Sequence, residues 1–210
     1  RTVAAVSVPP GYRYLTDQSV RRLTLSLSPP TMDDQTDDWS RLQTALRKTP
    51  GGLAFTDTGD QDSGQQPVRL QASLSLIKRI GRILRQGQWQ ATAVLDTGLA
   101  QDGQRIARLL DLYPGPVAGE TPLWGVAIDI GTTTVSLWLV DLLDGQVHTQ
   151  VAEYNGQIAR GEDVISRIIY ASKNGGENEM RQLVLATINK LLERACQRVK
   201  IQPSEVFKAT

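Results

Sequence analysis

The sequence predicts a mixed α/β (α+β) protein with two domains, and three observations carry this prediction. Residues 124–145 alternate bulky and small side chains around a Gly-Thr turn, a pattern typical of two paired strands. Residues 163–200 repeat apolar side chains at three- and four-residue spacing, which predicts helices. Ahead of both, residues 113–122 contain three prolines and two glycines, which exclude a regular element. We therefore expect a domain boundary in that segment.

Composition limits the classes of function. Of the 210 residues, 40% are hydrophobic and 21% are charged, as is usual for a globular protein. The formal net charge of +1 gives no reason to expect nucleic acid as a partner, and no apolar run is long enough to span a membrane. The single cysteine, Cys196, excludes an internal disulfide or a thiolate metal cluster within this chain. We expect a cytoplasmic protein.

The first part of the chain reads as a linker at residues 1–20 and a small mixed middle domain at residues 21–118. Four aspartates precede an apolar repeat, which predicts a helix that ends near Lys48. A second helix is expected from Leu70 to about Gly87, and its basic side is either a solvated face or a docking surface. The remaining expected elements are strands at 2–8, 22–27, 89–95 and 105–112 and a polar loop at 56–66. None of these elements carries a recognisable catalytic constellation.

The second part, residues 119–210, is expected to hold three antiparallel strands, two helices and the start of a fourth strand at Val206. The second strand, 133–142, is apolar on both sides at its centre, so we expect cover on both faces. Asp144-Gly145 predicts a hairpin turn to the third strand, where His148 is expected at the surface. The helices are expected at 163–172, with Val164, Ile165, Ile168 and Ile169 on one face, and at about 179–200, with Cys196 beside its apolar stripe.

One carboxylate in this part needs a chemical explanation. Asp129 stands among small residues on one face of the first strand, and burying it unpaired would cost several kcal/mol or more. Gly131 follows it and lets backbone N–H groups approach a ligand, and three hydroxyls come next, on Thr132, Thr133 and Thr134. The sequence therefore predicts a site for phosphate and magnesium on a hairpin.

This order of elements resembles the opening of the actin-like (ribonuclease H-like) ATPase fold of sugar kinases, acetate kinases and large heat-shock chaperones. The resemblance is carried by Asp129, Gly131 and the three threonines. Downstream, Tyr154-Asn155-Gly156-Gln157 and Gly161 to Ile168 resemble the NxQ...GxDVISRI signature of the reductive activators of corrinoid proteins, the RACo-type ATPases. Gly156 stands where that family usually has proline, so the loop is expected to be looser.

The resemblance implies a function and a set of roles. Such an ATPase uses ATP to reduce an inactive cobalt(II) corrinoid protein to cobalt(I), with electrons from a 2Fe-2S ferredoxin-like domain. Asp129 would hold Mg2+ through water, and residues 131–134 would donate to the β- and γ-phosphates of ATP. Further catalytic candidates, for orienting the attacking water or closing the site, are Asn155, Gln157 and Asp163. A structural alternative stays open for these residues, namely a polar loop and a helix N-terminus stabilised by Asp163, with Arg167 paired to Asp163 at i,i+4.

The same resemblance implies that this chain is an interior fragment of a homodimeric protein. The cluster domain would precede Arg1, and the second phosphate loop would follow Thr210. Two alternatives stay open at this point: a phosphotransferase of the sugar or acetate kinase type, and a non-catalytic scaffold that binds ATP. The first predicts a phosphorylated product, and the second predicts nucleotide-dependent polymers.

Overall fold

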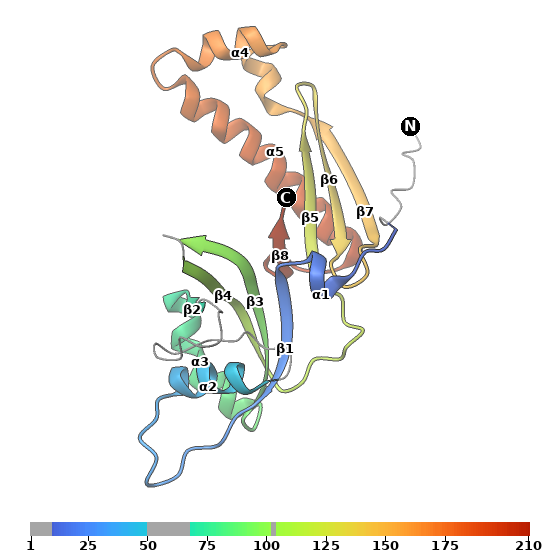
Figure 1. Ribbon diagram of the computed structural model, residues 1–210. Coiled ribbons are helices and arrows are strands. Elements are labelled where there is room, and N and C mark those ends of the chain that lie inside the picture. The colour runs from blue at the N-terminus through green and yellow to red at the C-terminus, as the bar shows by residue number, and fades with distance from the viewer. Residues whose placement is uncertain (1–9, 50–67, 102–103) are drawn as a thin grey trace. The chain divides into compact units, whose positions relative to one another are not determined.

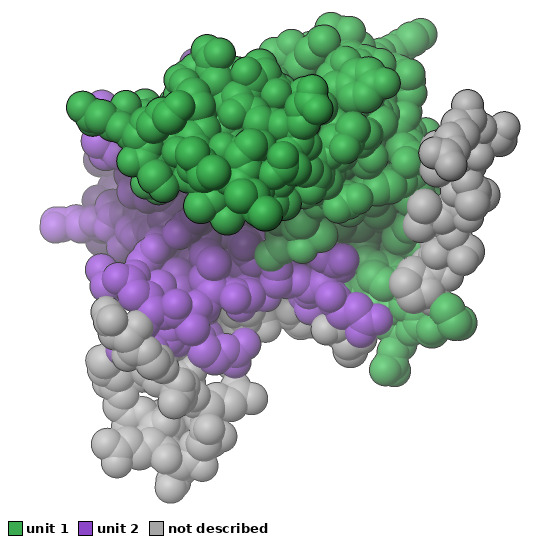
Figure 2. All heavy atoms as spheres, turned by 90° about the horizontal axis from the view of Figure 1, so that it is seen from above, with its two compact units in different colours: residues 1–14, 122–210 green, residues 15–121 purple. Residues whose placement is uncertain are grey.

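The computed structural model describes residues 10–49, 68–101 and 104–210, which form two compact units. Unit 1 contains residues 10–14 and 122–210, and unit 2 contains residues 15–121 (Figure 2). The boundary between the units in this part of the chain falls within a short helix, α1 (Tyr14–Asp17), whose first residue belongs to unit 1 and whose others belong to unit 2. The expected strand at 2–8, the polar loop at 56–66 and the Asp102-Gly103 turn lie outside the described residues.

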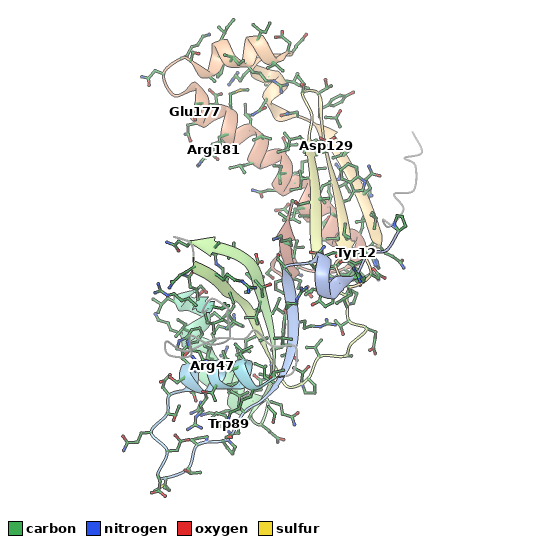
Figure 3. All side chains as sticks on the ribbon, in the orientation of Figure 1. Tyr12, Arg47, Trp89, Asp129, Glu177 and Arg181 are labelled. Atoms are coloured by element: carbon green, nitrogen blue, oxygen red, sulfur yellow. The ribbon has the colours of Figure 1, made fainter. Side chains whose placement is uncertain are left out.

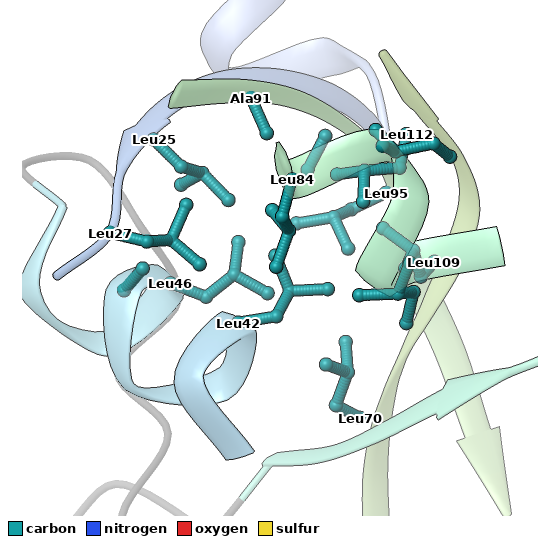
Figure 4. Packing of buried hydrophobic residues seen from close by; sticks show 14 of the residues in the cluster. Leu25, Leu27, Leu42, Leu46, Leu70, Leu84, Ala91, Leu95, Leu109 and Leu112 are labelled. Carbon is teal, nitrogen blue, oxygen red and sulfur yellow. The ribbon is translucent and has the colours of Figure 1, made fainter. Parts of the chain in front are cut away.

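Unit 2 is a four-stranded sheet with two helices. The strand order is β1-β3-β4-β2, in which β1 (Val20–Ser26), β3 (Gln90–Gln101) and β4 (Gln104–Pro114) are antiparallel neighbours and β2 (Val68–Ala72) runs parallel to β4. The helices are α2 (Asp38–Lys48) and α3 (Leu74–Gln86). Their apolar sides pack on the sheet in one cluster, and Figure 4 shows Leu42 and Leu84 of the helices beside Leu95 and Leu109 of the sheet.

The first helix of unit 2 begins where its acidic cap predicts. Asp37 accepts a hydrogen bond from the Ser40 N–H at 3.0 Å, and this bond satisfies one of the free donors at the start of α2. The second helix is shorter than expected, because Leu70 lies in strand β2 and α3 begins only at Leu74. A short apolar run suits a strand as well as a helix, and pairing with β4 decides between them here.

The basic side of α3 is mainly solvated. Lys78, Arg79 and Arg82 are exposed. Arg85 forms an ion pair with Asp38 at 2.8 Å and lies 5.3 Å from the centre of the Trp89 ring.

Unit 1 is a second four-stranded sheet, with the order β7-β6-β5-β8. The antiparallel strands β5 (Trp124–Ile130), β6 (Thr134–Asp141) and β7 (Val147–Tyr154) agree with the sequence prediction, and β8 (Val206–Ala209) adds parallel to β5. Between β7 and β8 the chain forms η2 (Gly156–Arg160), α4 (Val164–Ala171), α5 (Gly176–Val199) and η3 (Pro203–Glu205).

The long helix α5 covers one face of this sheet. Leu191 and Ala195 pack on Val126, Leu137 and other buried strand residues, and Cys196 is a buried core residue as predicted. Along β6, buried and half-buried residues alternate. Full cover of both faces is therefore not confirmed for the described residues, because Ser136, Trp138 and Val140 on the second face are half-buried. His148 is exposed, as predicted, and lies edge-on to the Trp124 ring at 4.9 Å.

Helix α4 is oriented against expectation. It begins after Asp163 as predicted, yet its four aliphatic side chains, Val164, Ile165, Ile168 and Ile169, are 57% to 71% exposed. Its polar side faces the rest of unit 1, because Tyr170 donates a hydrogen bond to Glu179 of α5. No helix in the described part of the chain is long and apolar enough to cross a membrane.

Candidate functional site

The tip of the β5–β6 hairpin brings the predicted phosphate-site residues together. Asp129 lies opposite Ser136 in the strand pair, near the end of β5 (Figure 3), and the turn follows at once. Asp129 and the three threonines are exposed, so the carboxylate does not bear the burial cost expected from the sequence. Instead it stands in solvent beside the turn, where a cation can reach it.

Gly131 makes the turn tight. Its N–H donates to the Thr134 carbonyl oxygen at 2.9 Å, and this bond closes the loop. A Cβ atom at position 131 would lie 2.8 Å from that same oxygen, closer than real side chains come. Glycine is therefore required for this close backbone approach.

The three carbonyl groups of the turn are all held from the segment after β7. The Asn155 side-chain Nδ2 donates to the Gly131 oxygen at 2.9 Å, and the Asn155 backbone N–H donates to the Thr133 oxygen at 2.8 Å. The Arg167 guanidinium donates to the Thr132 oxygen. These bonds fix the direction of every peptide group in the turn.

The donors of the turn are left available. Among the residues that the structure describes, the N–H groups of Thr132 and Thr133 have no hydrogen-bond acceptor, and neither do the hydroxyls of the three threonines. Successive free backbone donors with hydroxyls beside them form a concave donor set that suits an anion such as phosphate. The turn thus presents donors and has its acceptors already occupied.

Asn155 and Gln157 connect the turn to helix α5. Asn155 is 1% exposed, and its Oδ1 accepts from the Gln157 N–H at 3.0 Å. The Gln157 Nε2 donates to the Met180 carbonyl of α5 at 2.9 Å. Both side-chain amides are therefore bonded to protein atoms, which gives the turn a rigid support.

Asp163 caps helix α4. Its carboxylate accepts from the Ser166 N–H at 2.9 Å, and the Ser166 Oγ lies within hydrogen-bond distance of the Asp163 N–H, which makes a capping box. The bond from the Ser166 backbone lowers the pKa of Asp163 below its ordinary value. Asp163 thus remains a charged carboxylate at the start of α4.

The sequence reasoning missed the role of Arg167. An ion pair with Asp163 was expected, but among the described residues Arg167 instead bonds three oxygens, those of Thr132, of Gly161 at 2.9 Å and of the Gln157 side chain at 3.4 Å. Its position on the side of α4 opposite the four aliphatic residues was the available signal. That signal was misread because the apolar side was assumed to face inward.

Thr187 was also missed. Its Oγ1 accepts from the Gly156 N–H at 3.1 Å and donates to the Leu183 carbonyl at 3.0 Å. Proline has no N–H, so this bond is available to the chain because position 156 is glycine. The loop at Gly156 was expected to be less rigid than in the family, but this hydrogen bond attaches it to α5.

The described residues contain no group of three or more His, Cys, Asp or Glu side chains placed to hold a metal ion. Mg2+ commonly binds through one or two carboxylates, waters and substrate phosphates. Asp129 beside a phosphate-type donor set fits that mode of binding.

Comparisons with known proteins agree with the resemblance to the reductive activators of corrinoid proteins. A family model described as the RACo linker region matches residues 13–119, and one described as the RACo middle region matches residues 124–210. The corrinoid activation enzyme RamQ of Eubacterium limosum is 34% identical over 102 residues, which are 48% of this chain and 17% of RamQ. A solved reductive activator for corrinoid, iron-sulfur protein is 33% identical, with a TM-score of 0.66 over 92% of this chain and 27% of that one.

The two family models meet between residues 119 and 124, where the two units also divide. The segment treated above as a middle domain matches the linker-region model, and the segment treated as the start of an ATPase domain matches the middle-region model. The chain spans about a quarter of the length of the solved relative.

Proposed function

The chain belongs to the RACo family of reductive activators, and we propose that the protein carrying it activates a corrinoid protein by ATP-driven reduction of cobalt(II) to cobalt(I). The observation that carries this proposal is the match of both family models, in sequence order, to residues 13–119 and 124–210. The names of the two similar proteins, a corrinoid activation enzyme and a reductive activator, support it.

The reaction needs an electron donor and an energy source. One electron is added to cobalt(II), and ATP and water are converted to ADP and phosphate. A one-electron step that is uphill by about 300 mV costs roughly 7 kcal/mol, within reach of one or two ATP hydrolyses. Cys196 is the only cysteine of the chain and is buried, so the electrons would come from an iron-sulfur domain, of 2Fe-2S type, outside these residues.

We assign the ATP-binding role to the hairpin turn. Asp129 would hold Mg2+ through water, and the N–H groups of Thr132 and Thr133 and the hydroxyls of residues 132–134 would bind the β- and γ-phosphates. The Gly131 N–H, which was also expected to donate, is bonded to the Thr134 oxygen instead, so Gly131 contributes the tight turn. This assignment is supported by the free N–H and hydroxyl groups of the turn, whose carbonyl oxygens accept hydrogen bonds from Asn155 and Arg167. Preorganised donors of this kind stabilise phosphate charge without having to reorganise during the reaction.

Asn155, Gln157 and Asp163 stay predictions for orienting the attacking water or closing the site. Their observed hydrogen bonds favour a positioning role, since Asn155 and Gln157 support the turn and Asp163 begins the helix that carries Arg167. We further propose that the protein is a cytoplasmic homodimer whose macromolecular substrate is the corrinoid protein.

The proposal is tested with the full-length protein, a cobalt(II) corrinoid protein, a low-potential reductant and Mg-ATP, by following the absorbance of cobalt(I). Asp129→Asn should lower the ATP-dependent rate on the order of 100-fold. Asp144→Asn is the matched control, because Asp144 is an exposed carboxylate beyond the other end of β6. Its Oδ1 accepts a hydrogen bond from the Gln146 N–H at 2.9 Å. Equal rates with and without ATP, or a phosphorylated product without cobalt(I), would contradict the proposal.

A further inference from the structure

One side of helix α3 carries positive charge that no carboxylate balances. Lys78, Arg79 and Arg82 are exposed, and within the part of the chain that the structure describes none of them forms an ion pair. At 3.6 residues per turn their positions span an arc of about 100°, on the side of the helix away from the core cluster. The neighbouring Arg85 is paired with Asp38, so three unbalanced charges remain.

This arrangement does not serve the stability of the helix. Arg82 lies at i,i+4 from Lys78 and at i,i+3 from Arg79, and like charges at these spacings repel each other. Helix α3 contains no acidic residue that could offset them. By contrast, several helix cations elsewhere in the described residues are paired with a carboxylate, namely Arg41, Arg160, Lys190 and Arg194. The positive side of α3 is therefore better explained by binding than by folding.

An exposed apolar side chain borders the positive side of α3. Leu74 is 66% exposed and stands one turn before Lys78, so the two side chains are neighbours on the helix surface. We call Leu74, Lys78, Arg79 and Arg82 the α3 patch. An apolar contact with charges around it is the common anatomy of a protein-binding surface. The overall formal charge of +1 does not supply the strongly basic field typical of nucleic-acid binding, so the α3 patch fits an acidic protein surface.

The proposed function indicates which protein brings that acidic surface. The corrinoid protein is a separate molecule that has to be found by diffusion and released after each reduction. Charge complementarity acts mainly on the encounter of separate molecules, and it suits small, short-lived contacts such as those of electron transfer. An iron-sulfur domain on the same polypeptide is already present at a high effective concentration and gains little from such steering.

We propose that the α3 patch docks an acidic surface of the corrinoid protein and steers its association. This inference rests on the proposed function and adds the contact by which the macromolecular substrate is recognised. Three solvated charges and one apolar side chain form a small contact. The charges therefore act on the rate of association more than on the lifetime of the complex.

The test is stopped-flow association of the full-length protein with the cobalt(II) corrinoid protein, followed by fluorescence over a series of salt concentrations. The variant with Lys78→Gln, Arg79→Gln and Arg82→Gln together should associate about tenfold more slowly at low salt and depend less on salt. In the cobalt(I) assay, its kcat/KM for the corrinoid protein should fall by about the same factor, with kcat unchanged. Its thermal midpoint should equal or exceed that of the wild-type protein, because the removed charges face solvent and repel one another.

A matched control removes the same charge elsewhere in unit 2. Arg69, Arg105 and Arg108 are exposed residues of β2 and β4, and their combined replacement by glutamine should leave association close to the wild-type rate. Leu74→Ser tests the apolar part of the α3 patch. It should speed dissociation and leave the salt dependence of association unchanged, because it removes no charge.

The outcomes separate this inference from the proposed function. Equal slowing by both triple variants overturns the docking role of the α3 patch, because net charge alone would then account for it. An unchanged association rate, or a fall in the thermal midpoint of the α3 variant, also overturns it, since another part of the polypeptide would then cover the patch. Binding of double-stranded DNA that depends on the patch, without an effect on the corrinoid protein, would assign the patch to nucleic acid instead. Cobalt(I) formation by the wild-type protein is measured in the same preparations, so failure of the proposed function is seen separately.

Discussion

Replacement of Asn155 by alanine should destabilise unit 1 and also impair the phosphate binding that we propose for the β5–β6 turn (residues 131–133). The substitution removes the donor to the Gly131 oxygen at 2.9 Å and the acceptor of the Gln157 N–H at 3.0 Å. Asn155 is 1% exposed, so water does not readily replace these bonds. Two lost bonds, with half-buried partners left unsatisfied, cost about 2–4 kcal/mol, a large share of the roughly 5–15 kcal/mol of a typical domain.

The free energy of unfolding is measured by urea denaturation, and Mg-ATP affinity by titration of the full-length protein. Asn155→Asp separates the two effects, because it keeps the acceptor for Gln157 and turns a charged oxygen toward the Gly131 carbonyl. We expect the aspartate variant to lose more ATP affinity than the alanine variant. Asn189→Ala, at an exposed position of α5, is the control. An Asn155→Ala protein with wild-type stability and ATP affinity would refute the reasoning about the turn.

Two further predictions concern stability. Hydrogen bonds from Thr36 and Arg41 lower the pKa of Asp34 from 3.8 to about 2, so its contribution to folding stability is complete above about pH 4 and is lost as pH falls toward 2. In Asp34→Asn, the urea midpoint should therefore depend less on pH between about 4 and 2. The same pH dependence as in the wild-type protein would contradict this prediction. Gly176→Ala should lower the thermal midpoint, at a cost of more than about 2 kcal/mol, because its Cβ would meet the Tyr170 carbonyl oxygen at 2.2 Å. Gly119→Ala, which points into open space, should leave that midpoint unchanged, and equal midpoints for both variants would show the clash to be relieved.

The elements predicted correctly are those with local signals. The aspartates before α2, the Asp144-Gly145 turn and the alternation along β5 each act within a few residues of chain, so they can be read without knowledge of the fold. The prediction that a helix begins at Leu70 was wrong, because the five residues of β2 contain too few periods to separate a strand from a helix. Its parallel pairing with β4, more than thirty residues away, settled the matter.

The sequence by itself determined the family resemblance, the hairpin and the donor residues of its turn, since these depend on residue types at fixed short spacing. Only the tertiary structure decided how the turn is held. Asn155 reaches Gly131 across 24 residues and Arg167 reaches Thr132 across 35, and no local pattern encodes such pairs. It also decided which side of α4 faces solvent, because periodicity fixes which residues share a face and packing against the rest of the unit chooses the face that is buried.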